Sequence, residues 1–369
     1  MQKKKIPLFL GGLLCISGVF VVAALPLWHW VTLLLDGGST WWFWPLWLLL
    51  SLSISLSYLL PWGPARKFFH RLGEGWMWAG IYLALAFWAQ ALLLLLFKQI
   101  WGSLSREDMV LAGWIALAVF GAIYLFGVLN ARVFRSKTYE IPAPVQKQVR
   151  LLLLSDLHLG YFTTNAMLQR IVDKAEKAAP DIILIAGDLF DMDFAELRGR
   201  EEKQRLLCSL TQLAPTYACL GNHDNLFPEE ERLHWLRQCR FLVLQDTFVE
   251  KKGLVIYGRR DKVDPLRQKH VVLPVTCQDK PLLILDHQPQ TYKQNWAEGA
   301  FLVLSGHTHG GQTFPGNFLQ QLIFSAPIYG IRQQGEQYLL VTSGAGYWGP
   351  PLRLWVNNEV VSLTLVPKE

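Results

Sequence analysis

The sequence is poor in cysteine and in charged side chains. Its 369 residues include 5 cysteines, and 17% of the residues are charged whereas 51% are hydrophobic. Because the cysteines form no CxxC pair and their number is odd, we expect a reduced compartment, no structural disulfide and no thiolate metal site. Internal repeats and low-complexity segments are absent as well. The cysteines are Cys15, Cys208, Cys219, Cys239 and Cys277.

The hydropathy of the chain indicates two parts. A mean hydropathy of +0.22 is too high for a single soluble domain, and the later part has too many charges for a chain that lies wholly in a membrane. The formal charge of +6 does not indicate a nucleic-acid partner, because the basic residues gather beside apolar stretches, as they do at membrane flanks. We therefore expect a membrane part, a soluble part and no bound nucleic acid.

Four apolar stretches occupy the first 130 residues, at 6–28, 41–60, 76–97 and 109–129. Each has about 20 residues, which as a helix can cross a hydrocarbon core of roughly 30 Å. We therefore predict an all-α anchor of four transmembrane helices over residues 1–130. A cleaved signal peptide is the alternative for the first stretch, since Lys3, Lys4 and Lys5 precede it. No charged residue lies within the stretches, which argues against a transport pathway.

The basic residues between the stretches predict the orientation of the chain. Three lie before the first stretch, three after the second and three after the fourth, whereas the other two loops carry none and two. Because cytoplasmic loops carry the excess of Lys and Arg, both ends are expected in the cytoplasm. The result is a multi-pass membrane protein with a cytoplasmic C-terminal domain.

The remaining sequence predicts a linker and one layered domain. Residues 131–148 are basic and broken by Pro142 and Pro144, as expected of a linker with a short edge strand. Over residues 149–369, apolar strands first alternate with amphipathic helices and then follow one another. This order favours an α/β domain in which two sheets pack as a sandwich with helices outside. Its first strand contains four leucines, 151–154, which is typical of a buried parallel strand.

Polar clusters follow five of the predicted strands. One spacer residue in extended chain would place Asp156 and His158 on the same side. Oxygen and nitrogen donors without thiolates suit Mn²⁺, Fe or Zn²⁺, and they exceed what one tetrahedral ion needs, so two ions are expected. Each cluster alone is typical of turns, whereas five in succession indicate a metal site. The clusters are Asp156 and His158; Asp188 and Asp191 in GDLFD; Asn222, His223 and Asp224 in GNHD; His287; and His307 and His309 in GHTHGGQ.

In this order, DLH, GDLFD, GNHD, His287 and GHTH resemble the motifs of the calcineurin-like metallophosphoesterase superfamily, from residue 149 to about residue 366. GHTHGGQ and the tail that begins VTSGAGYWGPP resemble its membrane-associated bacterial branch, which includes enzymes similar to the UDP-2,3-diacylglucosamine hydrolases of lipid A synthesis. The resemblance implies a bacterial inner-membrane location and does not extend to the four apolar stretches.

The resemblance also implies a role for each polar residue. Asp188 would bridge two divalent ions, and a hydroxide shared by these ions would attack the phosphorus, since metal ions lower the pKa of bound water. His223 would act as general acid or donate to the phosphoryl group, with Asp224 orienting it and Asp191 holding a ligand histidine. The other ligands implied are Asp156, His158 and His309 for the first ion, and Asn222, His287 and His307 for the second.

The expected function is that of a membrane-anchored, two-metal phosphodiesterase or pyrophosphatase. Its partners would be the lipid bilayer and a lipid-linked phosphoester such as a UDP-diacylglucosamine-like molecule, and Mn²⁺ is the expected metal, with Fe or Zn²⁺ as alternatives. A soluble nucleotide or a phosphoprotein is the alternative substrate. A metal-binding scaffold or sensor without turnover is the alternative of another class.

Two further groups of residues have two interpretations each. Arginines near strand ends could meet a phosphate or be solvated, and these are Arg259, Arg260 and Arg353. Aromatic residues near the last motif could receive acyl chains or pack in the ordinary way, and these are Phe314, Phe318, Tyr347 and Trp348.

Overall fold

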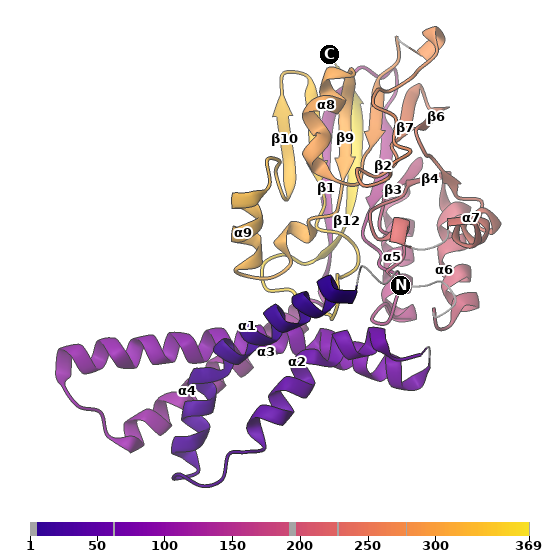
Figure 1. Cartoon of the computed structure of the whole chain (residues 1–369). Helices are drawn as coiled ribbons and strands as arrows, with labels where there is room; N and C mark the ends of the chain where they lie inside the picture. Colours follow the sequence, from indigo (N-terminus) through magenta and orange to yellow (C-terminus); the bar gives the residue numbers. More distant parts are fainter. Residues whose placement is uncertain (1–5, 62, 192–196, 227–228, 278, 369) are drawn as a thin grey trace. The chain divides into compact units, whose positions relative to one another are not determined.

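The computed structural model describes residues 6–61, 63–191, 197–226, 229–277 and 279–368 (Figure 1). The chain divides into two compact units, Met1–Phe126 and Gly127–Glu369, each of which is described by itself.

The first unit is helical, as the apolar stretches predict. Its helices are α1 (Ile6–Leu34), α2 (Phe43–Leu59), α3 (Pro64–Trp101) and α4 (Arg106–Asn130), the last of which ends in the second unit. Pro64 begins α3, where a missing N–H costs nothing. Among the described residues, α3 and α4 are long and apolar enough to cross a membrane. An anchor with four spans therefore stays a prediction.

Aromatic residues form the core of the first unit. Trp30, Trp47 and Phe87 are buried there. The indole N–H of Trp47 donates to the Phe20 carbonyl at 3.0 Å, and that of Trp30 donates to the Val110 carbonyl at 3.1 Å. Trp30 and Trp47 thus each keep a hydrogen-bond acceptor within an apolar core.

Within the described residues, the second unit forms two six-stranded mixed sheets, with strand orders β1-β12-β2-β3-β4-β5 and β10-β11-β9-β8-β7-β6. The first sheet consists of β1 (Phe134–Ala143), β12 (Asn358–Pro367), β2 (Val149–Leu154), β3 (Ile182–Ala186), β4 (Thr216–Cys219) and β5 (Leu242–Val243). The second consists of β10 (Gly330–Gln334), β11 (Gln337–Val341), β9 (Ala300–Ser305), β8 (Leu282–Leu285), β7 (Leu254–Gly258) and β6 (Thr247–Lys251).

The two sheets pack as the predicted sandwich. Leu151 and Leu153 of β2 face the second sheet, whereas Leu152 and Leu154 face the helices α5 (Asn165–Ala178), α6 (Arg200–Leu213) and α7 (Glu229–Gln238). Both faces of β2 are thus buried, which explains its run of leucines. The outer face of the second sheet packs on α8 (Tyr292–Ala297). Figure 1 shows α6 and α7 on the side of the domain opposite β10 and α9 (Gly316–Ile323).

Strand direction brings the predicted clusters to one edge. Strands β2, β3 and β4 run parallel in the first sheet, and β7, β8, β9 and β11 run parallel in the second. The five polar clusters follow β2, β3, β4, β8 and β9, so each lies just beyond the carboxyl end of its strand. Open α/β sheets commonly bind ligands at this edge.

The segment predicted to be a linker belongs to the sandwich. Residues 134–143 form β1, which pairs in parallel with β12 from Phe134 opposite Asn358 to Ala143 opposite Pro367. It is the edge strand of the first sheet. The basic and proline residues of 131–148 therefore suit a sheet edge, where charged side chains and proline oppose pairing with other chains.

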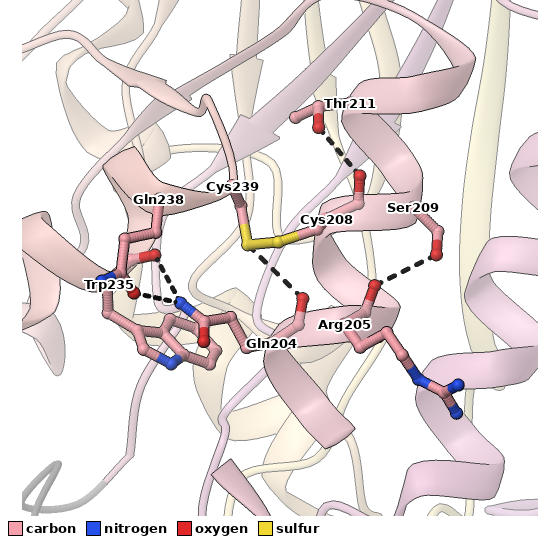
Figure 2. The surroundings of a disulfide bond; sticks show 8 residues. All are labelled: Gln204, Arg205, Cys208, Ser209, Thr211, Trp235, Gln238 and Cys239. Atoms are coloured by element: carbon pink, nitrogen blue, oxygen red, sulfur yellow. Dashed lines mark hydrogen bonds between the residues drawn. A yellow bond between two sulfur atoms is a disulfide. The ribbon is translucent and has the colours of Figure 1, made fainter. Parts of the chain in front are cut away.

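The prediction of no structural disulfide was wrong. Cys208 of α6 and Cys239, the residue after α7, form one (Figure 2). It joins two helices that also share hydrogen bonds, since Gln204 Nε2 donates to the Trp235 carbonyl at 3.2 Å and to Gln238 Oε1 at 2.6 Å. The odd cysteine count misled because it includes Cys15 of α1 and two buried free thiols, Cys219 and Cys277.

Candidate metal centre

The backbone is strained at five of the predicted metal ligands. Residues other than glycine rarely adopt a positive φ, and such strain concentrates at functional sites. Strand β2 ends at Leu154, so the left-handed turns beyond it, rather than the alternation of an extended chain, bring the first two ligands together. The residues and their φ values are Asp156 (53°), His158 (44°), Asp188 (51°), His307 (72°) and His309 (50°).

Two glycines permit the loops to approach each other. A Cβ on Gly221 would lie 2.1 Å from Asp188 Oδ1, and a Cβ on Gly306 would lie 2.3 Å from Asp156 Oδ2. Both distances are far below van der Waals contact, so no other residue fits these positions without a shift of the carboxylates.

Asp156, His158 and His309 form the first group of donors, and all three are buried. His158 Nε2 lies 3.0 Å from His309 Nε2, and Asp156 Oδ1 lies 3.9 Å from the former and 3.5 Å from the latter. Metal–nitrogen bonds of about 2.0–2.1 Å place two ligands at a right angle roughly 3 Å apart. The spacing of the two imidazole nitrogens therefore fits ligands of one divalent ion.

The second group consists of Asp188, His287, His307 and Asn222. His287 Nε2 lies 3.1 Å from Asp188 Oδ2 and 3.2 Å from Asn222 Oδ1, and His307 Nδ1 lies 2.8 Å from the same amide oxygen. The Nδ1–H of His287 donates to the Ala186 carbonyl at 2.8 Å. This bond leaves the lone pair on Nε2, which is the atom that faces the other donors.

Asp188 lies between the two groups. Its Oδ2 is 3.1 Å from His287 Nε2 in the second group and 3.8 Å from His158 Nε2 in the first. Its Oδ1 accepts the backbone N–H of His223 at 2.9 Å, which fixes the plane of the carboxylate. A carboxylate in this position can offer oxygen to both ions, as a bridging ligand requires.

The electrostatics of the donors fit bound cations. Burial raises the pKa of Asp156, whereas His287 holds the pKa of Asp188 well below its usual range against the effect of burial. Burial opposes charge on His158, yet Asp191 and the other carboxylates raise its pKa to about 9. Burial and the charge of His287 lower the pKa of His307 to about 3. The carboxylates thus favour positive charge on their neighbours, which bound divalent cations would supply.

Asp191 contacts two histidines. Its Oδ1 lies 2.8 Å from His223 Nδ1 and 3.3 Å from His158 Nδ1. Burial acts to raise the pKa of this carboxyl, but His158 outweighs it and keeps the pKa low, so the group is charged. In a neutral ring this carboxylate favours the tautomer with hydrogen on Nδ1, which would leave Nε2 of His158 for a metal ion and Nε2 of His223 for a substrate.

Asp224 binds backbone groups, whereas the family resemblance implied that it would orient His223. Its carboxylate accepts backbone N–H groups of Leu189 at 3.2 Å, Phe190 at 2.9 Å and Gly221 at 2.8 Å. Burial and nearby Asp188 raise its pKa to about 6. Asp224 therefore connects the GDLFD loop to the GNHD loop through hydrogen bonds. Asp191 is the carboxylate that contacts the His223 ring.

Two buried arginines depart from both interpretations given above. Arg353 donates from Nη1 to the His309 carbonyl at 3.3 Å and from Nη2 to the Ser343 carbonyl at 2.8 Å, so it supports a ligand loop. Burial lowers its pKa to about 10. Arg259 donates to Asn295 Oδ1 at 3.0 Å inside the domain. The apolar neighbours of Arg353 in LRLW were the available signal for burial.

Comparison with known proteins supports the family that these motifs resemble. Residues 149–311 match the calcineurin-like phosphoesterase family. An uncharacterized metallophosphoesterase of Campylobacter jejuni is 32% identical over 69% of this chain and 70% of its own length. A transmembrane protein with metallophosphoesterase domain from Danio rerio is 29% identical over 71% of this chain and 66% of its own length. The phosphodiesterase YaeI of Escherichia coli is 28% identical over 59% of this chain and 82% of its own length.

Proposed function

Because this chain belongs to the calcineurin-like phosphoesterase family and is a phosphoester hydrolase, we propose that it is a membrane-anchored two-metal enzyme acting on a lipid-linked phosphodiester or pyrophosphate. The observation that carries the proposal is the convergence of two donor groups around Asp188 at the carboxyl edge of both sheets. The class of metal donors, all oxygen and nitrogen, suits Mn²⁺, Fe or Zn²⁺.

In the proposed assignment, Asp188 serves both ions. When bound, the two ions supply Lewis acidity at the phosphoryl oxygens and an activated water near pH 7. The remaining ligands are Asp156, His158 and His309 for one ion and Asn222, His287 and His307 for the other.

His223 is the proposed general acid. Asp191 Oδ1 lies 2.8 Å from Nδ1 of this ring, and this contact would orient the ring so that Nε2 can donate a proton to the leaving oxygen. His223 is about one-fifth exposed, so a substrate can reach it, while the ligands His158 and His287 are buried.

A lipid-linked substrate is favoured by membrane association. Among the described residues, two helices are long and apolar enough to cross a bilayer. Relatives in Danio rerio and Bos taurus are named transmembrane proteins with a metallophosphoesterase domain. A protein held at a bilayer meets lipid phosphoesters at a high local concentration. A soluble nucleotide or phosphoprotein is the second candidate substrate.

Turnover of two substrates distinguishes these candidates. The full-length protein in mixed micelles with Mn²⁺ is assayed on a UDP-diacylglucosamine-like lipid and on the matching soluble diester without acyl chains. We expect kcat/KM to be higher for the lipid, and Asp188→Asn to abolish both activities. Equal or higher kcat/KM for the soluble diester would contradict the lipid-linked substrate and leave the phosphoesterase assignment intact.

The proposed location is the inner membrane of a bacterium, with several spans and the metal centre in the cytoplasm. The loop charges support this side. The disulfide between Cys208 and Cys239 favours the opposite side, because disulfides persist mainly in oxidising compartments. The redox state of this pair in cells therefore reports the side directly.

A further inference from the structure

Helix α9 presents an apolar face to the exterior of the second unit. Asn317 at its start is buried. Positions 318, 319, 322 and 323 lie on one side of a helix, because they are one, four and five residues apart. All four of these residues are large and apolar. They are Phe318, Leu319, Leu322 and Ile323, which are 55%, 52%, 68% and 78% exposed. A contiguous surface of this kind marks an interaction site in a well-packed domain.

The apolar helix lies directly beside the metal centre. The turn His309–Gly311, which carries a metal-ligand candidate, contacts the start of α9. A Cβ on Gly311 would lie 2.2 Å from the Cα of Asn317, so the two backbones are in close contact. A partner that binds α9 would therefore lie close to the loop that carries His309.

The same end of the domain receives the chain from α4. The carbonyl of Gly127, the first residue of the second unit, accepts the N–H of Arg353 at 3.0 Å, and the N–H of Leu354 donates to the Gln312 carbonyl at 3.0 Å. Gln312 stands four residues before α9. Gly127, where α4 enters the second unit, is thus connected to the segment before α9 through the hydrogen bonds of Arg353 and Leu354.

We propose that the exposed face of α9, together with Trp355, docks on the surface of a lipid bilayer. Phenylalanine, leucine and isoleucine suit the boundary of the acyl chains, and tryptophan suits the headgroup level. Trp355 is 60% exposed. It lines a cavity of about 460 Å³ with Gln321 of α9 and with Arg332, which is exposed. The arginine places a positive charge where anionic headgroups would lie.

The bilayer is favoured over other occupants by the connection to α4. Because α4 continues directly into the second unit at Gly127, a span formed by α4 would limit how far this end of the domain can move from the bilayer. The inference rests on membrane association and not on the proposed substrate. Docking would hold the metal centre at the leaflet that contains lipid phosphoesters.

Two matched cysteine variants test the docking surface. Ile323→Cys and Val275→Cys replace β-branched residues that are 78% and 77% exposed. Val275 lies in the turn Val275–Cys277, and Cys277 of this turn contacts Glu250 at 3.0 Å. Glu250 pairs with Val255 at the start of β7. The turn therefore lies at the opposite end of the strands from the metal loops. Each full-length variant is labelled with an environment-sensitive fluorophore and reconstituted into vesicles of phosphatidylethanolamine and phosphatidylglycerol, with the labelled parent protein as background.

The expected result is opposite for the two positions. The label at 323 should show a blue-shifted emission, severalfold stronger quenching by lipids with nitroxide-labelled acyl chains, and loss of quenching by iodide, whereas the label at 275 should be quenched by iodide alone. Equal iodide quenching at both positions would overturn the proposal. Protection of position 323 from iodide without quenching by the nitroxide lipids would also overturn it, because a protein surface or second copy would then cover α9. Neither readout depends on activity, so failure of docking is distinguishable from failure of the proposed function.

Discussion

Replacing Asp191 with asparagine is expected to slow the hydrolysis of poor leaving groups far more than that of good ones. Asp191 Oδ1 lies 2.8 Å from His223 Nδ1, and this contact would orient the ring whose Nε2 donates a proton to the leaving oxygen. An alkoxide leaving group needs this proton, whereas p-nitrophenolate is stable without it. General acid catalysis contributes about 10²–10⁴-fold, so we expect kcat for an alkyl leaving group to fall by about 10²-fold or more and kcat for p-nitrophenolate to fall much less.

The second contact of Asp191 requires a control for metal affinity. The same oxygen lies 3.3 Å from Nδ1 of the ligand candidate His158, and the loss of a partner of this kind costs about 10–100-fold in metal affinity. The comparison is therefore made at saturating Mn²⁺. Asp173→Asn, in an exposed position of α5, is the matched control and should change neither rate.

A double variant separates action through His223 from a general loss of structure. If Asp191 acts through that ring, Asp191→Asn combined with His223→Ala should have the same kcat as His223→Ala alone, since groups that act as a unit are not additive. Equal losses with both leaving groups, or additive losses in the double variant, would refute the assignment.

Three further outcomes are expected. Gly221→Ala should lower both the midpoint of thermal unfolding and kcat, because its Cβ would lie 2.1 Å from Asp188 Oδ1 and overpacking costs about 1–3 kcal/mol; an unchanged kcat would contradict the described loop packing. Reduction of the Cys208–Cys239 disulfide, whose cysteines are 31 residues apart, should cost about 3–4 kcal/mol by the chain-entropy estimate, seen as a lower melting midpoint with dithiothreitol. A fluorescent protein fused after the C-terminus should fluoresce if the domain is cytoplasmic, as the loop charges predict, and alkaline phosphatase fused there should be active if it is not.

The strand-end motifs predicted most of the residues that the structure brings together in the candidate metal centre. Four leucines before Asp156 and the glycines of GDLFD and GNHD mark the ends of buried strands, and parallel strands bring such ends to one edge. The two-sheet sandwich followed from the same alternation. The predicted reason for the convergence of Asp156 and His158 was wrong, since both lie in left-handed turns beyond β2.

Long-range contacts account for what the sequence did not reveal. Asp224 is adjacent to His223 in the chain, but its carboxylate accepts two backbone N–H groups of the GDLFD loop and one of its own loop. The more distant Asp191 contacts the His223 ring. The disulfide joins α6 to the end of α7 at a spacing without a local motif. Arg353 is buried because it meets carbonyls of loops that only the folded domain brings together.

The metal content of the purified full-length protein tests the central claim most directly. Inductively coupled plasma mass spectrometry after loading with Mn²⁺ and removal of free metal should give two ions per chain for the parent and for the Asp173→Asn control. Variants His309→Ala and Asp188→Asn should bind fewer, because His309 belongs to the first donor group and Asp188 lies between both. A single ion in the parent protein, or two ions retained in both variants, would contradict the account.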